Sequence, residues 1–411
     1  MADDYTMDIT AGIDVGNGYV KAKLAIDGAD PVTADLPSCV VWRSRVRDIP
    51  VAPTDAYMDG LVNELDCEVH STAIKQTDQS RVLVGRRAVA SGFSPIMFDI
   101  NDAHPKCNES LSYQLILSVL ASTAVSEFYR RHHALPTEIL RVEAYVGVAL
   151  PIADFMDYSE NYRHSLMNTA HTVHIYNFDE EVTVKISFVG VEVVAEGAAA
   201  QYAIVDMGPA FMDACLAAAR HSGMVIDESE TGESLLSYDN TVGIDIGEGT
   251  VNFPVFRNGR VSVEASDSIK RGYGTMLDQV IEDLRNFAYA PKTRKELSEF
   301  MLKQNPNPRD RKLMEKLSVS IKDNSIMFAR EIQSAYNRIM NKVQLNVDVV
   351  YVYGGGANAM RDSLYPFLIE ASKLDEDTYT PVIWLDSTFS RDLNRNGLFV
   401  VAKVAREARG L

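Results

Sequence analysis

The sequence predicts an α/β protein made of two similar domains, and three observations support this prediction. Strand-like apolar runs alternate with segments of helical periodicity, which is the pattern of α/β architecture. An eleven-residue sequence occurs twice, at 10–20 and at 241–251, with seven identical positions. The 411 residues exceed the length of one ordinary domain. Because the copies start 231 residues apart, too far for a solenoid repeat, a duplicated domain explains them best.

The composition indicates a globular protein with an acidic surface. Apolar residues make up 46% of the chain, enough for large cores, and the formal net charge is −17. An acidic surface repels nucleic-acid phosphates and anionic lipid, so we expect no direct nucleic-acid or membrane partner, and any link to DNA requires a basic adaptor. No cysteine pair has metal-ligand or CxxC spacing, which favours buried, reduced thiols. The cysteines are Cys39, Cys67, Cys107 and Cys215.

The ends of the sequence and its apolar runs predict a cytoplasmic protein. The acidic N-terminal segment has no apolar core of a secretory signal. No run approaches the roughly 18 apolar residues that a membrane-spanning helix needs.

Local patterns place the main elements along the chain. Each repeat copy predicts a strand, a glycine turn and a second strand, at Tyr19–Ile26 and Thr250–Arg257. The segment 222–240 is acidic and rich in Ser and Gly, which predicts a surface insertion. Further strands are expected at 142–150, 182–194 (as two short strands), 347–352 and 382–385, and helices at 109–130, 196–219, 274–287, 310–344, 358–373 and 395–409.

Three glycine-rich turns follow predicted strands, and they suit phosphate binding. They are Asp14–Gly18, Asp245–Gly249 and Gly354–Gly356. Glycine lets backbone N–H groups approach an anion closely, and an aspartate at the strand end can hold hydrated Mg²⁺. A single turn of this kind is equally well explained as a plain hairpin. Two similar copies favour a pair of turns that bind one Mg-nucleotide from opposite sides. The chain has no Walker A loop and no G-x-G-x-x-G sequence, which disfavours P-loop and Rossmann proteins.

These segments carry a family resemblance. Ile13–Lys21 resembles the first phosphate motif of the actin, sugar kinase and Hsp70 superfamily, Thr241–Asn252 its second, and Val349–Ala357 its adenosine motif. Within the superfamily the chain is similar to ParM-type actin-like DNA segregation proteins. Spaced signatures in the same order support that similarity: 36–38 (LPS), 84–88 (VGRRA), 150–155, 191–199 (VEVVAEGAA) and 396–399 (NGLF).

The resemblance implies an actin-like fold, with two RNase H-like α/β domains and a nucleotide cleft between them. Domain I is expected at 1–240, with an insertion at about 35–100, completed by the C-terminal helix 395–411. Domain II is expected at 241–394, with a helical subdomain at about 275–345. The implied ligand is ATP, with GTP as the alternative, together with Mg²⁺.

The resemblance also implies a role for individual residues. Glu196 would orient the attacking water, and Asp14 and Asp245 would hold Mg²⁺ through water; a helix-start glutamate favoured by the macrodipole is the alternative explanation of Glu196. Glu248 would add negative charge near phosphate, so its side chain should point away. The phosphates would be lined by Gly16, Asn17, Gly18, Lys21, Gly247, Glu248, Gly249 and Thr250, and the nucleoside by Gly354, Gly355, Gly356 and Ala357.

The function expected from the resemblance is a filament-forming ATPase that assembles head to tail and segregates plasmid or phage-type DNA through a basic adaptor. Because one fold serves many functions, three alternatives stay open. A small-molecule kinase needs a catalytic aspartate that the sequence does not identify. An Hsp70-like chaperone needs a further substrate domain, for which we expect no room. A scaffold with degenerate sites is disfavoured because Asp14, Asp245 and Glu196 are all present.

Overall fold

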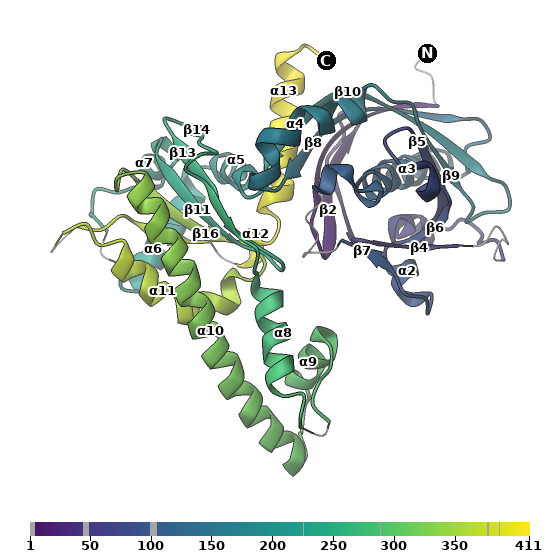
Figure 1. Cartoon of the computed structure of the whole chain (residues 1–411). Helices are drawn as coiled ribbons and strands as arrows, with labels where there is room; N and C mark the ends of the chain where they lie inside the picture. Colours follow the sequence, from purple (N-terminus) through teal and green to yellow (C-terminus); the bar gives the residue numbers. More distant parts are fainter. Residues whose placement is uncertain are drawn as a thin grey trace. The chain divides into compact units, whose positions relative to one another are not determined.

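The structure is a computed structural model that describes residues 5–43, 49–98, 105–224, 226–287, 289–375, 378–385 and 387–411 (Figure 1). The chain divides into two compact units. Unit 1 contains residues 1–206 and 394–411, and unit 2 contains residues 207–393. Both units combine strands and helices, so the α/β prediction is confirmed.

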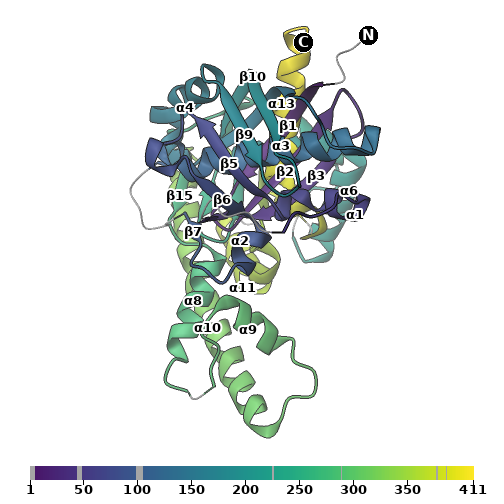
Figure 2. The same cartoon turned by 90° about the vertical axis from the view of Figure 1, so that its right-hand side faces the viewer.

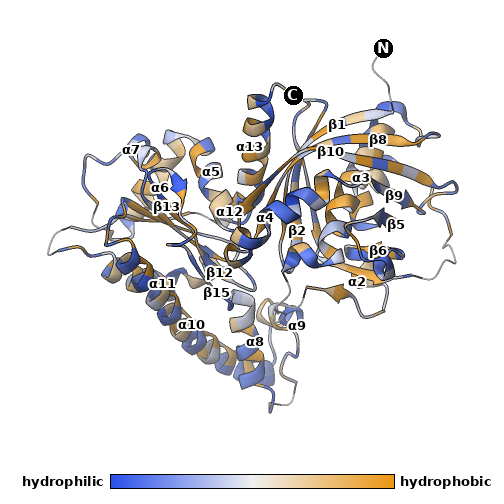
Figure 3. Cartoon of the chain, turned by 45° about the horizontal axis from the view of Figure 1, so that its top comes forward, coloured by the Kyte–Doolittle hydropathy of each residue, from blue (hydrophilic) through white to orange (hydrophobic). Residues whose placement is uncertain are grey.

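Unit 1 is built on a sheet that curls strongly (Figure 1). Within the described residues its ten strands run in the order β3-β2-β1-β8-β10-β9-β5-β6-β4-β7. The central strands β1, β8 and β10 are parallel and consist largely of hydrophobic residues (Figure 3). The strands are β1 Thr6–Val15, β2 Tyr19–Ile26, β3 Val32–Pro37, β4 Cys39–Trp42, β5 Asp66–Ser71, β6 Arg81–Val84, β7 Ile96–Met97, β8 Leu140–Leu150, β9 His171–Ile175 and β10 Val182–Ala195.

Helix α3, Ser110–His132, fills the concave side of this sheet. It contacts strands from both halves of the sheet, including β1, β8, β10, β5 and β9, so its apolar residues face partners nearly all round. In the described part of the chain α3 is the single unbroken helix long and apolar enough to cross a membrane, yet 83% of that apolar stretch is buried. Its apolar sequence is therefore explained by its place in the core.

The other helices of unit 1 are α1 Asp55–Asp59, α2 Arg86–Ala90, α4 Ile152–Met167, α5 Ala198–Met207 and α13 Leu393–Ala408, with short 3-10 turns η1 Leu61–Asn63, η2 Gln76–Asp78 and η3 Lys106–Asn108. Helix α13 packs so closely on β1 and β8 that the contacts require glycine. A Cβ at Gly12 would lie 2.2 Å from the Phe399 nitrogen, and one at Gly147 would lie 2.3 Å from the Leu398 oxygen. The spaced sequence at 396–399 is thus a packing feature of unit 1.

Unit 2 contains a second sheet, which in the described residues has seven strands. Strand β11 is central: it pairs antiparallel with β12 and β13 and parallel with β16, which pairs in turn with β17. Every residue of β11 and β16 is buried, as expected for strands covered on both faces. The strands are β11 Thr241–Ile246, β12 Val251–Phe253, β13 Val255–Arg257, β14 Arg260–Val261, β15 Asp267–Ile269, β16 Val349–Tyr353 and β17 Val382–Trp384.

A helical arm projects from the sheet of unit 2 (Figures 1 and 2). It consists of α8 Tyr273–Asp283, α9 Arg294–Met301 and the long α10 Pro308–Lys342, which begins with an Asn307 cap and a first-turn proline. The remaining helices of the unit are α6 Pro209–His221, α7 Gly232–Ser237, α11 Ala357–Ala371 and α12 Ser387–Ser390.

Several predicted elements differ in the structure. Segment 182–194 is one long strand with a register shift between Phe188 and Gly190, not two short strands, because it pairs with β8 on both sides of the shift. The helix expected at 196–219 is two helices, α5 and α6, separated by Gly208 at φ 79°. Pro254 divides the strand expected at 250–257 into β12 and β13.

The boundary expected at residue 240 also differs. Unit 1 ends at residue 206, and segment 207–240 belongs to unit 2. Packing explains the difference: Tyr351 in β16 donates a hydrogen bond to the Leu235 oxygen of α7, and Phe211 of α6 stacks edge-on against Phe389. The predicted insertion is thus partly helical, with α7 capped by Thr231. Position 225 of that segment, and 44–48 and 99–100 of the expected insertion at 35–100, lie outside the described residues.

Candidate functional site

The two repeated glycine sequences form the same tight hairpin. The Gly16 nitrogen donates to the Tyr19 oxygen over 3.0 Å in unit 1, and the Gly247 nitrogen donates to the Thr250 oxygen over 2.9 Å in unit 2. A Cβ at either glycine would lie within about 3 Å of the carbonyl that accepts this bond (2.8 and 3.0 Å), so glycine is needed at both turns. The repeat in the sequence is therefore a repeat of backbone geometry.

The turn residues leave backbone donors for an anion. The N–H groups of Asn17 and Gly18, and those of Glu248 and Gly249, donate to no acceptor among the described residues. In unit 1 the neighbouring carbonyls are engaged by Ser38, whose hydroxyl donates to the Gly16 oxygen (2.6 Å) and whose nitrogen donates to the Gly18 oxygen. Free N–H groups in a turn with occupied carbonyls suit phosphate.

Asp14 and Glu196 lie at the same edge of the unit 1 sheet. Strands β1, β8 and β10 are parallel, so their carboxyl ends meet at one edge, where ligands of α/β sheets bind. Asp14 is the penultimate residue of β1, and Glu196 directly follows β10, where its nitrogen donates to the Leu150 oxygen over 2.7 Å. Gly197, at φ 80°, then turns the chain into α5.

Lys106 connects the two parts of this edge. Its Nζ donates to Glu196 Oε1 over 2.9 Å and to the Val15 oxygen over 3.2 Å. Both side chains of the ion pair are largely buried, at 13% and 14% exposure. A pair shielded from solvent holds its geometry better than a surface pair. Lys106 therefore fixes the position of the Glu196 carboxylate relative to the glycine hairpin.

The surroundings of Asp14 destabilise the ionised form of its carboxyl group. Burial raises the pKa of its carboxyl to about 6; Lys21 and Lys106 lower it in part, and the Glu196 charge raises it. Lys21 lies opposite Asp14 in the β1–β2 ladder. A carboxylate that is destabilised by its site gains from an added cation, so this position fits a hydrated divalent ion held with phosphate.

Unit 2 brings the second hairpin and the third glycine turn together. Strands β11 and β16 are parallel, with Asp245 opposite Tyr353. Gly354 follows at φ 102°, and a Cβ there would lie 2.5 Å from Asp245 Oδ1. The Gly356 nitrogen donates to the Ile246 oxygen over 2.8 Å. Glycine is therefore needed at Gly354 for two reasons, its backbone conformation and its contact with the aspartate.

The Glu248 side chain is held by a cation, as its position requires. Its Oε1 accepts a hydrogen bond from Arg294 on α9 over 2.6 Å, and Arg294 also pairs with Asp278 of α8. The start of α8 docks on the same turn, since the Tyr273 and Gly274 nitrogens donate to the Gly247 and Glu248 oxygens. The negative charge of Glu248 is thus compensated by the helical arm.

Four residues that lie beside the glycine turns in the structure have no role predicted from the sequence. Each of them is far along the chain from the turn beside which it lies. Lys106, Arg294 and Arg395 reach the turns from separate elements and lie outside the motifs that carry the family resemblance. Ser38 belongs to the 36–38 (LPS) sequence, but no role was predicted for it. Arg395 acts on the Asp14 carboxyl electrostatically and pairs with Asp35 over 3.1 Å. These residues can be recognised as part of the site only once the tertiary contacts are known.

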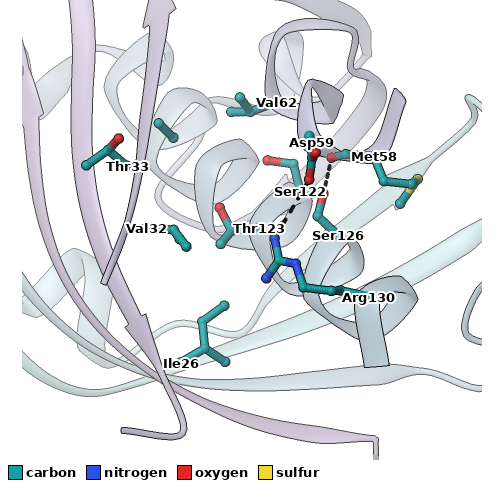
Figure 4. A pocket seen from close by; sticks show the side chains of 11 residues that line it. Ile26, Val32, Thr33, Met58, Asp59, Val62, Ser122, Thr123, Ser126 and Arg130 are labelled. Carbon is teal, nitrogen blue, oxygen red and sulfur yellow. Dashed lines mark hydrogen bonds and ion pairs between the residues drawn. The ribbon is translucent and has the colours of Figure 1, made fainter. Parts of the chain in front are cut away.

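Two further features bear on ligands. Among the described residues, no group of three His, Cys, Asp or Glu side chains is placed to hold a metal ion. A pocket of about 210 Å³ in unit 1 lies by Ile26, the end of β2 away from Gly16, where Ser126 donates to the Met58 oxygen and Arg130 approaches Asp59 (Figure 4). This pocket is separate from the glycine hairpin.

Comparison with known proteins agrees with this geometry. Residues 12–198 match the family model "Actin like proteins N terminal domain", and residues 243–365 match "Archaeal actin homologue MreB-like, C-terminal". The chain is an actin-like protein. The predicted actin-like fold is thereby confirmed, and both glycine hairpins lie within the matched segments.

Solved structures share the fold of this actin-like protein at low sequence identity. The actin-like protein Alp7A aligns with a TM-score of 0.64 at 16% identity, over 98% of each chain. The archaeal actin homologue Ta0583 aligns with a TM-score of 0.60 at 14% identity, over 97% of this chain and 99% of that chain. Bacillus thuringiensis ParM with ADP aligns with a TM-score of 0.59 at 15% identity, over the same shares. No curated protein matches by sequence.

Proposed function

We propose that this actin-like protein binds and hydrolyses ATP and assembles head to tail into filaments. The observation that carries the proposal is the edge of unit 1 where Asp14, Glu196 and Lys106 gather beside a glycine hairpin with unoccupied N–H groups. The repeated hairpin of unit 2 would bind the same nucleotide. The solved Bacillus thuringiensis ParM structures with ADP, AMPPNP and ATP support nucleotide as the ligand.

The residues of the site divide into three roles under this proposal. The N–H groups of 17–18 and 248–249, with Gly16, Lys21, Gly247 and Thr250, bind the phosphates. Gly354, Gly355, Gly356 and Ala357 border the nucleoside. Asp14 and Asp245 hold Mg²⁺ through water, and the ion neutralises phosphate charge when bound. GTP is the alternative nucleotide.

Glu196 orients the attacking water in this proposal. Positioning of water and electrostatic stabilisation are most of what phosphoryl transfer requires of a protein. The Glu196 carboxylate, held by Lys106, can accept a hydrogen bond from water. The second contact of Lys106, to the Val15 oxygen, keeps the lysine beside the phosphate turn. Lys106 is therefore a positioning residue.

The biological role would be that of a cytomotive filament of the ParM type. ATP-bound copies assemble, hydrolysis destabilises the polymer, and a basic adaptor links the filament to plasmid or phage-type DNA. The net charge of −17 favours a basic adaptor over direct DNA binding. The filament would act in the cytoplasm.

Light scattering and pelleting with Mg-ATP, Mg-ADP or no nucleotide, together with phosphate release, test the proposal. We expect assembly with ATP that reverses as ATP is consumed, and no assembly of Asp245→Ala. Transfer of phosphate to a small molecule without assembly would instead identify a kinase. Failure to bind any nucleotide would refute the proposal.

A further inference from the structure

The end of the helical arm differs in charge from the rest of the chain. We define the arm tip as residues 285–316, which join α8 to α10 and include α9 (Figure 2). The arm tip has nine Lys and Arg against four Asp and Glu, a net charge of +5. Because the whole chain carries −17, the other 379 residues carry −22. The arm tip is thus a basic surface on an acidic protein.

Part of this positive charge is available for a partner. Arg294 pairs with Glu248 and Asp278, and Lys303 pairs with Asp310. Arg285 and Lys295 pair with glutamates nearby in the sequence. By contrast, no side chain among the described residues forms an ion pair with four exposed cations of the arm tip. These are Lys292, Arg309, Arg311 and Lys312.

The arm tip also exposes large apolar side chains. Leu302 is 80% exposed and Tyr289 is 75% exposed, and Phe287 and Met301 are about half as exposed. Cations cover two of the rings: Arg309 lies 4.8 Å from the Tyr289 ring and Lys316 lies 4.7 Å from that of Phe287. Aromatic and arginine side chains of this kind are enriched where protein interfaces gain most of their binding energy.

The conformation of Tyr289 supports a role in binding. Its φ is +70°, in the left-handed region that costs energy for a bulky residue. It lines an open cavity of about 560 Å³ together with Asn307, Pro308, Arg309 and Asp310. The chain therefore holds an exposed aromatic ring, at some cost, beside a hollow that a partner side chain can enter.

A complementary surface lies in the same unit. We define the acidic segment as residues 227–239, which contain five Asp and Glu and no Lys or Arg. Asp227, Glu228, Glu233 and Asp239 are exposed. Arg220 anchors the backbone of this segment through the Asp227 and Glu230 oxygens. The acidic segment includes α7, and α7 and the arm tip lie at opposite ends of unit 2 (Figures 1 and 3).

We propose that the arm tip of one copy docks on the acidic segment of a second copy. The charges are opposite, the arm tip adds apolar area, and the two surfaces point away from each other within one unit. When two copies bind through different surfaces, the pair still has one unoccupied arm tip and one unoccupied acidic segment. Further copies can therefore add at both ends, and a polar filament results when the rotation between neighbouring copies does not close a ring. The inference rests on the proposed self-assembly and specifies its contact.

Charge reversal in both directions tests this contact. The first variant is Arg311→Glu with Lys312→Glu, the second is Glu228→Lys with Glu233→Lys, and the third combines all four changes. These side chains make no hydrogen bond or ion pair with described residues. Lys185→Glu with Lys403→Glu is a matched control in unit 1, since both lysines are exposed and the change in net charge equals that of the first variant.

We expect each double variant to raise the critical concentration for ATP-dependent assembly at least about tenfold, because like charges now face each other. The combined variant should return to within about threefold of the wild type, and the control should stay within about twofold. ATP binding, measured separately, should be unchanged in all of them.

Several results would overturn the inference. If the arm-tip variant assembles like the wild type, the arm tip is not a contact, although the proposed function survives. If the combined variant does not recover, the acidic segment is not its partner. A labelled DNA duplex gives a further test. If the duplex binds the wild type but not the arm-tip variant, and that variant assembles normally, the basic surface binds nucleic acid instead. A wild type that never assembles refutes both this contact and the proposed function.

Discussion

The two glycine hairpins have the same backbone and very different surroundings. Around the hairpin of unit 1 the structure gathers charge: Lys21, Lys106, Glu196 and Arg395 all act on Asp14. Around the hairpin of unit 2 the closest neighbours are mostly backbone groups, since the start of α8 and the Gly354 turn pack against 245–248. The charged residue Glu248 of this turn is paired with Arg294. The repeated sequence therefore gives both hairpins the same backbone. The residues that the rest of each unit places around a hairpin determine its chemical environment.

This difference predicts a division of labour. Unit 1 has the charged side chains that can orient water and interact with phosphate, so substitutions of these side chains should affect hydrolysis. Unit 2 has close contacts that only glycine allows, so substitutions there should affect folding and nucleotide affinity.

The largest expected effect comes from Glu196→Ala. Without the carboxylate that orients water, ATP hydrolysis should fall by about 100-fold or more, while ATP binding changes little. Phosphate release under saturating ATP measures the first quantity, and titration with a fluorescent ATP analogue measures the second. Polymers of this variant should persist longer. Glu181→Ala, in an exposed pair with His174, is the control; normal turnover of Glu196→Ala would exclude Glu196 from the mechanism.

Gly354→Ala should strongly destabilise unit 2. The new methyl group meets Asp245 Oδ1 at 2.5 Å and the backbone is in a left-handed conformation, so we expect a loss of about 2–4 kcal/mol in unfolding free energy. The neighbouring Gly355→Ala adds its methyl group to open space and should leave thermal stability unchanged. Equal melting temperatures for the two variants would contradict the packing described at Asp245.

Asp14→Asn should stabilise the nucleotide-free protein in a pH-dependent way. Burial raises the pKa of Asp14 to about 6, above the value of about 4 in an unfolded chain. The protonated form therefore favours folding below about pH 4, and this contribution is lost as the pH rises through 6. The asparagine variant should gain about 1–3 kcal/mol at pH 7 and nothing at pH 3.5. Denaturant unfolding measures the gain, with Asp30→Asn as an exposed control; a gain that is constant across this range would contradict the assigned cause.

Lys106→Met should have a smaller effect on turnover than removal of Glu196. The variant retains the apolar stem of the lysine but loses the contact that positions the carboxylate, so we expect about a tenfold lower kcat with little change in KM. Combining it with Glu196→Ala should add almost nothing, because both act through the same group. Lys75→Met, at an exposed position, is the control. Full additivity of the two changes would show that Lys106 acts independently of Glu196.

Much of the fold was predictable because its signals are local. The helices at 110–132, 308–342 and 357–371 follow from apolar periodicity, and both hairpins follow from glycine and strand patterns. The errors arose where tertiary packing overrode local patterns. Strand β10 stays continuous because β8 pairs along its length, and 207–240 joins unit 2 because α6 and α7 pack there.

The sequence by itself determined the two glycine turns and the aspartates at their strand ends, since each depends on residues close together in the chain. It also revealed the duplication, because the same short pattern occurs twice. Only the tertiary structure decided which side chains surround those turns. Lys106 lies 90 residues from Glu196, and Arg294 lies 46 residues from Glu248. Such pairs depend on how strands and helices pack, because burial and charge act through space, and neither separation leaves a pattern along the chain.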